Sequence, residues 1–270
     1  MARQWYHEVS LDWLKARADY ITATEIAKLV PAYKRARKKL DANPGLIVPE
    51  FAALWAEKNT PGQFDPVSYG PAARGHVMEP WAVGSYNAYL IECEEDTRFF
   101  HWDDILITDG KVGFSPDALN IPMALAGPLL TVNGKMLTDG EAAIPMPKEA
   151  MEIKAYEAAH HMKCCIKTKE EHDELIQVAT AFHVLKQLEA VTLCFYNPDA
   201  PIAMHVERYE RDELEEQLDM VKGIVELWDR TKYQCTRLGA EIPSKVTEEQ
   251  IYQDMLRRQA EEKSDHSFNF

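Results

Sequence analysis

Three residues of the sequence have the types and spacing of a metal-dependent hydrolytic site. Asp117 follows a Ser-Pro pair at the end of an apolar run, and Glu152 and Lys154 stand two apart in "MEIKAY". On a β-strand such spacing places both side chains on one face, and the carbonyl of Ile153 can face the same ion. Two carboxylates and a carbonyl make an all-oxygen site that suits Mg²⁺ or Mn²⁺ rather than zinc. A neighbouring lysine can orient a water or neutralise charge on a phosphoryl group. The alternative is a turn aspartate and a surface ion pair on an edge strand.

The spacing of apolar residues, which indicates the elements that position these residues, changes along the chain from helical to strand-like. A strong hairpin signal, Asp109-Gly110, joins two strand-like runs, and Asn133-Gly134 predicts a second hairpin. Helices are expected over 11–20, 22–40, 49–59, 66–90, 170–191, 210–238 and 243–263, and further strands over 150–156, 192–196 and 203–209. This order predicts an α/β (α+β) protein with a mixed central sheet flanked by helices.

Composition describes an ordinary soluble globular chain of 270 residues with a net charge of −14. The charge argues against coating nucleic acid by bulk electrostatics, but a local basic channel stays possible. We expect no membrane span and no signal peptide, and hence a cytoplasmic protein. The five cysteines form no C-x-x-C pair, which favours reduced thiols. In "HHMKCC" (160–165) a His and a Cys recur four apart, so zinc is an alternative to an incidental helix face.

Five short motifs occur in an order that resembles the lambda-type (YqaJ-like) phage recombination exonucleases of the PD-(D/E)xK nuclease superfamily. The resemblance runs from about residue 13 to residue 198. In chain order the motifs are Trp13-x-x-x-Arg17, Ile21-Thr-Ala-Thr-Glu25, Gly75-x-x-x-Glu79, Ser115-Pro-Asp117 and Glu152-Ile-Lys154.

The resemblance implies a restriction-endonuclease-like core and a role for each motif. Residues matching Asp117, Glu152 and the carbonyl of Ile153 bind the catalytic metals, with Glu79 at the second metal or its waters. Lys154 then positions the attacking water. This suggests Mg²⁺ (or Mn²⁺), with two ions per active site.

Two further residues match positions near the DNA end and its 5′ phosphate in that family. Arg17 fits this role on chemical grounds, because a planar guanidinium suits bidentate phosphate contact. For Thr24 a plain helix cap is an equal alternative. Both can hold together, since a helix N-terminus itself attracts phosphate.

The sequence departs from the family pattern in two places. About thirty residues separate the S-P-D and E-x-K motifs, where the family has a short hairpin, so the segment 118–150 is expected to add a hairpin at the rim. The family also carries a Gln facing the active site on the following helix. Our register places His183 there as a catalytic hydrogen-bond donor, with Gln187 one turn further on. A structural histidine is the alternative.

The densest basic patch is "YKRARKK" (33–39), which contains Lys34, Arg35 and Arg37. A solvated helix face is the usual explanation of such a run. Because the run follows the DNA-end motif, contact with the phosphate backbone is the competing hypothesis.

Together these features predict a metal-dependent exonuclease that degrades one strand of linear double-stranded DNA. The resemblance adds 5′→3′ polarity, a 3′ overhang for recombination, a homotrimeric ring, a single-strand annealing partner and a phage or prophage origin in a bacterial host cytoplasm. An endonuclease or nickase using the same site, or a non-catalytic DNA-end-binding protein, is the alternative. We expect one nuclease domain over 1–240 and a charged helix and tail over 241–270.

Overall fold

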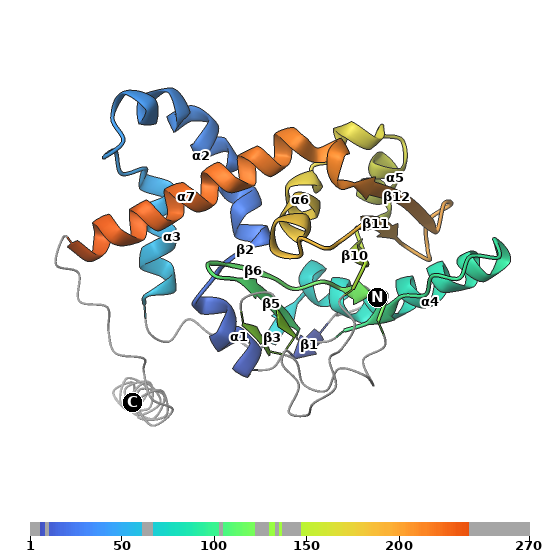
Figure 1. Ribbon diagram of the computed structural model, residues 1–270. Helices are drawn as coiled ribbons and strands as arrows, with labels where there is room; N and C mark the ends of the chain where they lie inside the picture. Colours follow the sequence, from blue (N-terminus) through green and yellow to red (C-terminus); the bar gives the residue numbers. More distant parts are fainter. Residues whose placement is uncertain are drawn as a thin grey trace, which may run out of the picture.

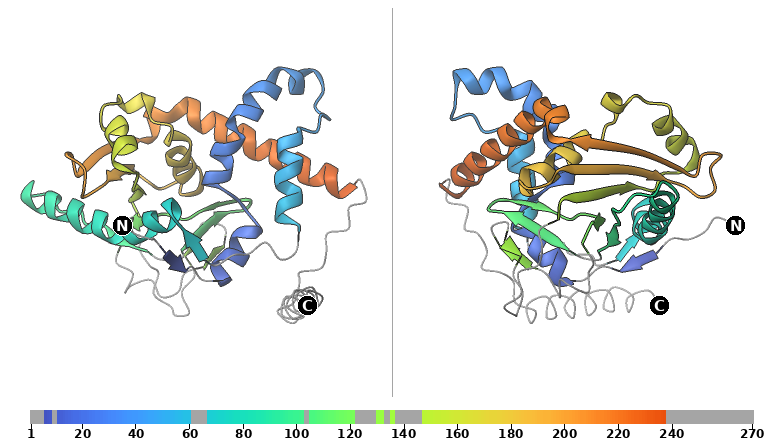
Figure 2. Two further views of the ribbon diagram at one scale, coloured as in Figure 1. Left: turned by 180° about the vertical axis from the view of Figure 1, so that it is seen from behind. Right: turned by 45° about the vertical axis from the view of Figure 1, so that its right-hand side comes forward.

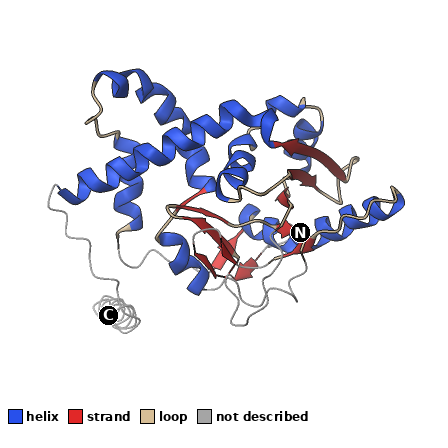
Figure 3. Ribbon diagram, in the orientation of Figure 1, coloured by secondary structure: helices blue, strands red, loops and turns tan. Residues whose placement is uncertain are grey.

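The computed structural model describes residues 6–8, 11–60, 67–102, 105–121, 130–132, 135–136 and 147–237. Its helices lie around short strands (Figures 1 and 3). The α-helices are α1 (Leu11–Ala18), α2 (Ala23–Ala42), α3 (Pro49–Lys58), α4 (Pro71–Glu92), α5 (Ala158–Cys165), α6 (Leu175–Val184) and α7 (Glu215–Arg237), and the 3₁₀ turns are η2 (Lys169–Glu171) and η3 (Arg211–Leu214). The strands are β1 (Tyr6–Glu8), β2 (Ile21–Thr22), β3 (Val67–Tyr69), β4 (Phe100–His101), β5 (Leu106–Asp109), β6 (Val112–Phe114), β7 (Ala118–Leu119), β8 (Leu130–Val132), β9 (Lys135–Met136), β10 (Glu149–Lys154), β11 (Ala190–Tyr196) and β12 (Met204–Glu210).

Two mixed five-stranded sheets form the centre of the fold. The first has the order β12-β11-β10-β7-β4, and within it β10 and β11 run parallel. The second has the order β2-β6-β5-β8-β9, and β1 pairs with β3 apart from both. The long antiparallel pair β11–β12 stands out in the right-hand view of Figure 2. The predicted α/β class with mixed sheets flanked by helices is confirmed.

Alternation along β10 divides the protein interior into two cores. Met151 and Ile153 pack into a cluster with residues of α4 on one side. Ala150 belongs to the larger cluster, on the side of α2, α6 and α7. Period 2 therefore places Glu152 and Lys154 on this second side, as predicted. The predicted strand 150–156 is confirmed with an end at Lys154.

Both predicted hairpins are present, but the strand runs around the first are shorter than expected. β5 and β6 pair antiparallel about a turn that contains Gly110, whose φ of +62° favours glycine. β8 and β9 pair antiparallel in the second hairpin, whose turn residues lie outside the described ranges. The strand-like run before Asp109-Gly110 (99–108) does not form one strand, because β4 and β5 belong to different sheets. The sequence of that run contains Asp103-Asp104, and aspartate has a low propensity for strands.

Two helix predictions need correction. The expected helix over 170–191 is only α6, because a 3₁₀ turn precedes it and β11 starts at Ala190. The helix expected over 66–90 is preceded by β3 and begins at Pro71, a residue favoured in a first helical turn. Pro80 lies inside α4. The helix expected over 243–263 lies outside the described residues.

Within the described ranges, no helix is long and apolar enough to cross a membrane.

Candidate active site

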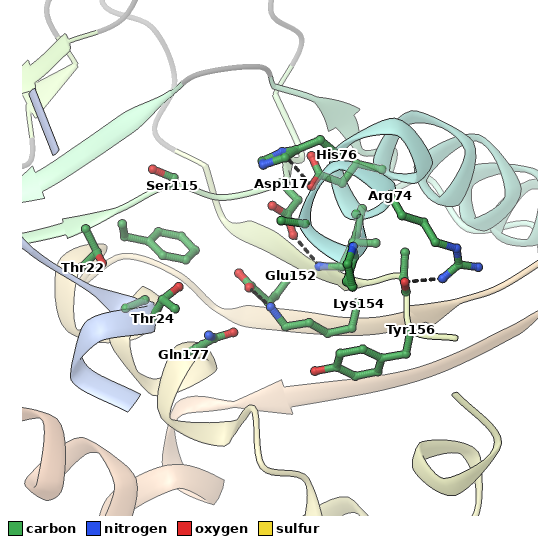
Figure 4. Close-up of a pocket in the computed structure, with 18 of the residues that line it drawn as sticks. Thr22, Thr24, Arg74, His76, Ser115, Asp117, Glu152, Lys154, Tyr156 and Gln177 are labelled. Carbon is green, nitrogen blue, oxygen red and sulfur yellow. Dashed lines mark hydrogen bonds and ion pairs between the residues drawn. The ribbon is translucent and has the colours of Figure 1, made fainter. Parts of the chain in front are cut away.

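A pocket of about 610 Å³ opens where the two central sheets meet. Asp117 lies between β6 of one sheet and β7 of the other, so the chain crosses between the sheets at this residue. The aspartate therefore does not simply end a hairpin strand, as the sequence suggested. The pocket wall combines this crossover with β10 and with the N-terminal parts of α2 and α4 (Figure 4).

Asp117, Glu152 and Lys154 meet in this pocket although the first is separated from the others by more than thirty residues. The Ile153 backbone N–H donates a hydrogen bond of 2.6 Å to Asp117 Oδ2. On the same strand Lys154 Nζ lies 2.6 Å from Glu152 Oε1. Glu152 is 8% exposed, so this ion pair is largely shielded from water. Figure 4 shows these side chains converging on one space.

The acids of the pocket repel one another. Burial raises the pKa of Asp117 well above its ordinary value, and the charges of Glu79 and Glu152 raise it further. Burial alone would lower the pKa of Lys154, but the carboxylates of Glu152 and Asp117 outweigh it, and the net direction is upward. The lysine is therefore held in its charged form between two acids.

Glu79, on α4, has two histidine partners. Its carboxylate lies 3.3 Å from His76 Nδ1 and 3.2 Å from His101 Nε2. Burial works to raise the pKa of Glu79, but the hydrogen bonds from His101 and His76 prevail and lower it to about 2. Glu79 thus stays ionised in a half-buried position next to Asp117.

The predicted DNA-end residues also reach the pocket. The Arg17 guanidinium stacks 4.2 Å from the Trp13 ring centre, and both residues line the pocket. Burial lowers the pKa of Arg17, while the charges of Glu25, Glu152 and Asp117 oppose this.

The first turn of α2 lines the pocket. Its N-cap is Thr22, whose backbone N–H donates to Glu25 Oε2 at 2.8 Å. Thr24 is therefore not the cap, and it lines the pocket as an exposed hydroxyl in the first helical turn (Figure 4). The cap explanation applies to Thr22, which leaves the Thr24 hydroxyl available for a ligand.

Comparison with known proteins gives a fold. No family model matches the chain, and no curated protein matches it. Among solved structures the chain is similar to an alkaline exonuclease, LHK-Exo, from Laribacter hongkongensis. The identity is 19% and the TM-score 0.55, over 86% of this chain and 100% of that one. The fold is that of an alkaline exonuclease. A structure of LHK-Exo in complex with dAMP aligns at 20% identity and a TM-score of 0.49, over 94% of this chain and 99% of that one. The resemblance inferred from the five motifs is confirmed for the fold.

The basic run lies away from the pocket. Lys34, Arg35 and Arg37 are exposed on α2 and do not line the pocket. Ten residues of helix separate Lys34 from Thr24, a rise of roughly 15 Å. Arg35 pairs with Glu50 at 2.5 Å. Contact of these three residues with a DNA backbone stays a prediction, and the structure places them outside the pocket.

The predicted placement of His183 is wrong. His183 does not line the pocket, whereas Gln177, on the same helix, does (Figure 4). The reason is the start of α6 at Leu175, five residues later than the sequence suggested. Gln177 therefore lies in the first turn, next to β10. His183 follows Gln177 by six residues, and at 100° per residue its side chain points to a different face of α6.

Several pocket residues had no clear signal in the sequence. Arg74 is buried and donates from Nη1 to the Ala155 carbonyl. The Tyr156 hydroxyl donates to Glu174 Oε1 at 2.5 Å, and its ring stacks on His160 with centres 4.0 Å apart. Arg74 is four residues before Met78 and directly precedes the Gly75-x-x-x-Glu79 motif. Helical spacing, which places Arg74 and Met78 on one face of α4, was the only feature of the sequence that indicated its burial.

The alternative zinc site in "HHMKCC" gains no third ligand in the described part of the chain. His161 Nε2 lies 2.7 Å from the Ile202 carbonyl and 3.4 Å from Cys165 Sγ. His160 stacks on Tyr156 instead. These residues form a helix face with local partners.

The residues of the pocket fit a hard divalent cation. Glu79, Asp117 and Glu152 supply carboxylate oxygens, which are the ligands that Mg²⁺ and Mn²⁺ prefer. The donor set decides the fit, because three carboxylates line one pocket and the Ile153 N–H holds Asp117 in place.

Proposed function

We propose that this protein is a metal-dependent nuclease, and more specifically an exonuclease that degrades one strand of linear double-stranded DNA from 5′ to 3′. The observation that carries the proposal is the convergence of Asp117, Glu152 and Lys154 in one pocket at the junction of two sheets. The alkaline-exonuclease fold supports the nuclease class. Removal of one strand would leave a 3′ single-stranded overhang for recombination by strand annealing.

Asp117, Glu152, Glu79 and the carbonyl of Ile153 would hold Mg²⁺ or Mn²⁺, with two ions per site. When bound, such ions activate a water and stabilise charge on the oxygens of an in-line displacement. The chain itself supplies the arrangement of the acids. The Ile153 N–H orients Asp117, while His76 and His101 keep Glu79 ionised.

Lys154 would position the attacking water and hold positive charge next to the phosphoryl group. Its ammonium is kept protonated by Glu152 and Asp117, so it acts as a donor and not as a base in the resting pocket. Gln177 adds an amide whose Oε1 is buried and has no hydrogen-bond partner among the described residues. That amide is available to a water or to a substrate oxygen.

The 5′ phosphate of the DNA end would lie between Arg17 and the start of α2. Arg17 offers a partly buried guanidinium braced on Trp13, and the helix N-terminus adds a positive dipole end and the Thr24 hydroxyl. A phosphate site at one end of the pocket is the feature that favours 5′ ends over 3′ ends.

A homotrimeric ring and a single-strand annealing partner complete the proposal. A ring can be acidic outside and basic inside, which reconciles a net charge of −14 with DNA binding. Exposed apolar side chains on α4, Trp81, Tyr89 and Ile91, favour self-association.

Digestion of linear duplex labelled separately at each 5′ and 3′ end, with Mg²⁺, tests the proposal. We expect the 5′ label to be released first and the 3′-labelled strand to stay long. The same reaction with Asp117→Asn should lose at least about 10²-fold in rate, because a metal ligand is removed. Wild-type rates from this variant would contradict the assignment of the pocket.

Closed circular plasmid in the same buffer provides the control for the alternatives. An exonuclease leaves it intact, since it has no end. Cutting of the circle as fast as of the linear duplex would identify an endonuclease or nickase, and binding to ends without any cleavage would identify a DNA-end-binding protein.

A further inference from the structure

A second cluster of chemically active side chains lies outside the pocket. His172 precedes α6, and His205 and Glu207 lie on the edge strand β12. Each offers one ligand atom, and these three atoms all lie within 4.8 Å of one another. We refer to these three residues as the His172 cluster.

His172 is buried without a polar partner. It is 3% exposed, and neither ring nitrogen has a hydrogen-bond partner among the described residues. Its ring packs instead on Phe195, with ring centres 4.8 Å apart. An unpaired buried polar group destabilises the folded state. A histidine that only filled the core would find a hydrogen-bond partner or be replaced by an apolar residue, so the ring nitrogens are available for another role.

His205 and Glu207 have the separation of ligands that share an ion. They stand two apart on β12 and face the same side. His205 Nε2 lies 3.3 Å from Glu207 Oε1, yet this nitrogen makes no hydrogen bond within the described ranges. In a tetrahedral shell with bonds of about 2.0–2.1 Å, neighbouring ligand atoms stand roughly 3.3 Å apart. The three ligand atoms of the cluster all lie within 4.8 Å of one another, so a small movement of the His172 ring would bring its nitrogen to this spacing.

The donor set distinguishes this cluster from the active-site pocket. Two imidazoles and one carboxylate suit zinc and other divalent transition metals, and three protein ligands leave a position for water. Both ring nitrogens of His172 are buried without a hydrogen-bond partner among the described residues, so the ring can offer one of them to a metal. Mg²⁺ prefers oxygen ligands and would compete poorly here.

We propose that His172, His205 and Glu207 form a binding site for a divalent transition metal of the zinc type, separate from the carboxylate pocket. The site would fasten the segment before α6 to the edge strand β12. It would also steady the pocket wall, because Glu174, two residues after His172, accepts the hydrogen bond from Tyr156, which lines the pocket. The metal therefore acts as a positioning element and touches no reacting atom.

Zinc binding to untagged wild-type protein, measured by calorimetry in excess Mg²⁺, tests the proposal without any nuclease assay. We expect one Zn²⁺ per chain, because Mg²⁺ occupies the all-oxygen pocket. The same stoichiometry should persist in an Asp117→Asn/Glu152→Gln protein. His172→Leu should weaken zinc binding at least about 100-fold, and His183→Asn, outside both sites, should leave it unchanged.

Glu207→Gln covers the case in which His172→Leu fails to fold, since Glu207 is partly exposed and the amide keeps its shape. It should also weaken zinc binding. Wild-type zinc affinity in a folded His172→Leu or Glu207→Gln protein would overturn the proposal. So would a loss of the zinc in Asp117→Asn/Glu152→Gln, which would place it in the pocket.

Discussion

The carboxylate pocket and the His172 cluster lie on the same face of one sheet and differ in how their charges are balanced. In the register of the strands, Glu152 stands opposite Leu193, which stands opposite Glu207. Two strand spacings therefore separate the two sites, about 10 Å. In the pocket, Lys154 neutralises Glu152, and His76 and His101 lie within 3.3 Å of the Glu79 carboxylate. In the cluster, a neutral buried histidine has no such partner.

The difference shows how one sheet face can separate two kinds of cation. Crowded carboxylates create a site that repels itself when it is empty and attracts a hard, oxygen-seeking ion. Two imidazoles with a single carboxylate create a site with less charge that selects a softer metal. Leu193 and Phe195 lie between the two groups and keep their polar atoms apart.

The largest effect is expected from a substitution that removes one charge from the pocket and leaves the surrounding residues unchanged. Lys154→Gln should lower the rate of duplex digestion by about 10²–10³-fold, because the charge next to the phosphoryl group is lost. The matched control is Lys148→Gln. Lys148 begins the same strand region and pairs with Glu189 at 2.8 Å, but its side chain is 68% exposed. An equal loss in both variants would show that the effect is not specific to the pocket.

An intermediate effect concerns acid stability and Glu79. A pKa lowered from 4.5 to about 2 contributes stability above pH 4.5 that is lost as the pH falls toward 2. At about 1.4 kcal/mol per pKa unit, this corresponds to roughly 3 kcal/mol. Urea unfolding across this range should therefore show a shallower acid loss for Glu79→Gln than for wild type. Glu50→Gln, in an exposed pair with Arg35, is the control and should keep the wild-type slope.

The smallest effects are expected for the stability of the metal-free protein when one residue of either site is replaced. Asp117→Asn removes a repelled carboxylate and keeps an acceptor for the Ile153 N–H, so it should raise the free energy of unfolding in chelator by on the order of 1 kcal/mol. His172→Leu replaces an unpaired buried ring and should change the free energy of unfolding by no more than about 1 kcal/mol in chelator.

Added ions then separate these two variants. Mg²⁺ should stabilise His172→Leu as it does wild type, but should stabilise Asp117→Asn less. Zn²⁺ in excess Mg²⁺ should do the reverse. Identical responses of the two variants to both ions, followed by thermal melting, would mean that the molecule has one metal site and not two.

Local sequence features predicted much of the fold and part of the site. The two-residue spacing of Glu152 and Lys154 required a shared face, and the Asp-Gly turn required a hairpin; both are present. Predictions failed where the start of an element depends on how the preceding chain folds and not on the residues of the element itself. His183 was misplaced because the start of α6 depends on the 3₁₀ turn before it, and a shift of a few residues rotates every side chain of a helix.

The sequence by itself determined which residues can do chemistry and which of them share a strand face, because side-chain type and period 2 are local properties. Only the tertiary structure decided which segments meet. Asp117 reaches Glu152 because the chain crosses between two sheets at that residue, and His172 meets β12 because its ring packs on Phe195 of the neighbouring strand β11. Neighbouring strands are chosen by packing across long stretches of chain, and a single segment carries no record of its partner.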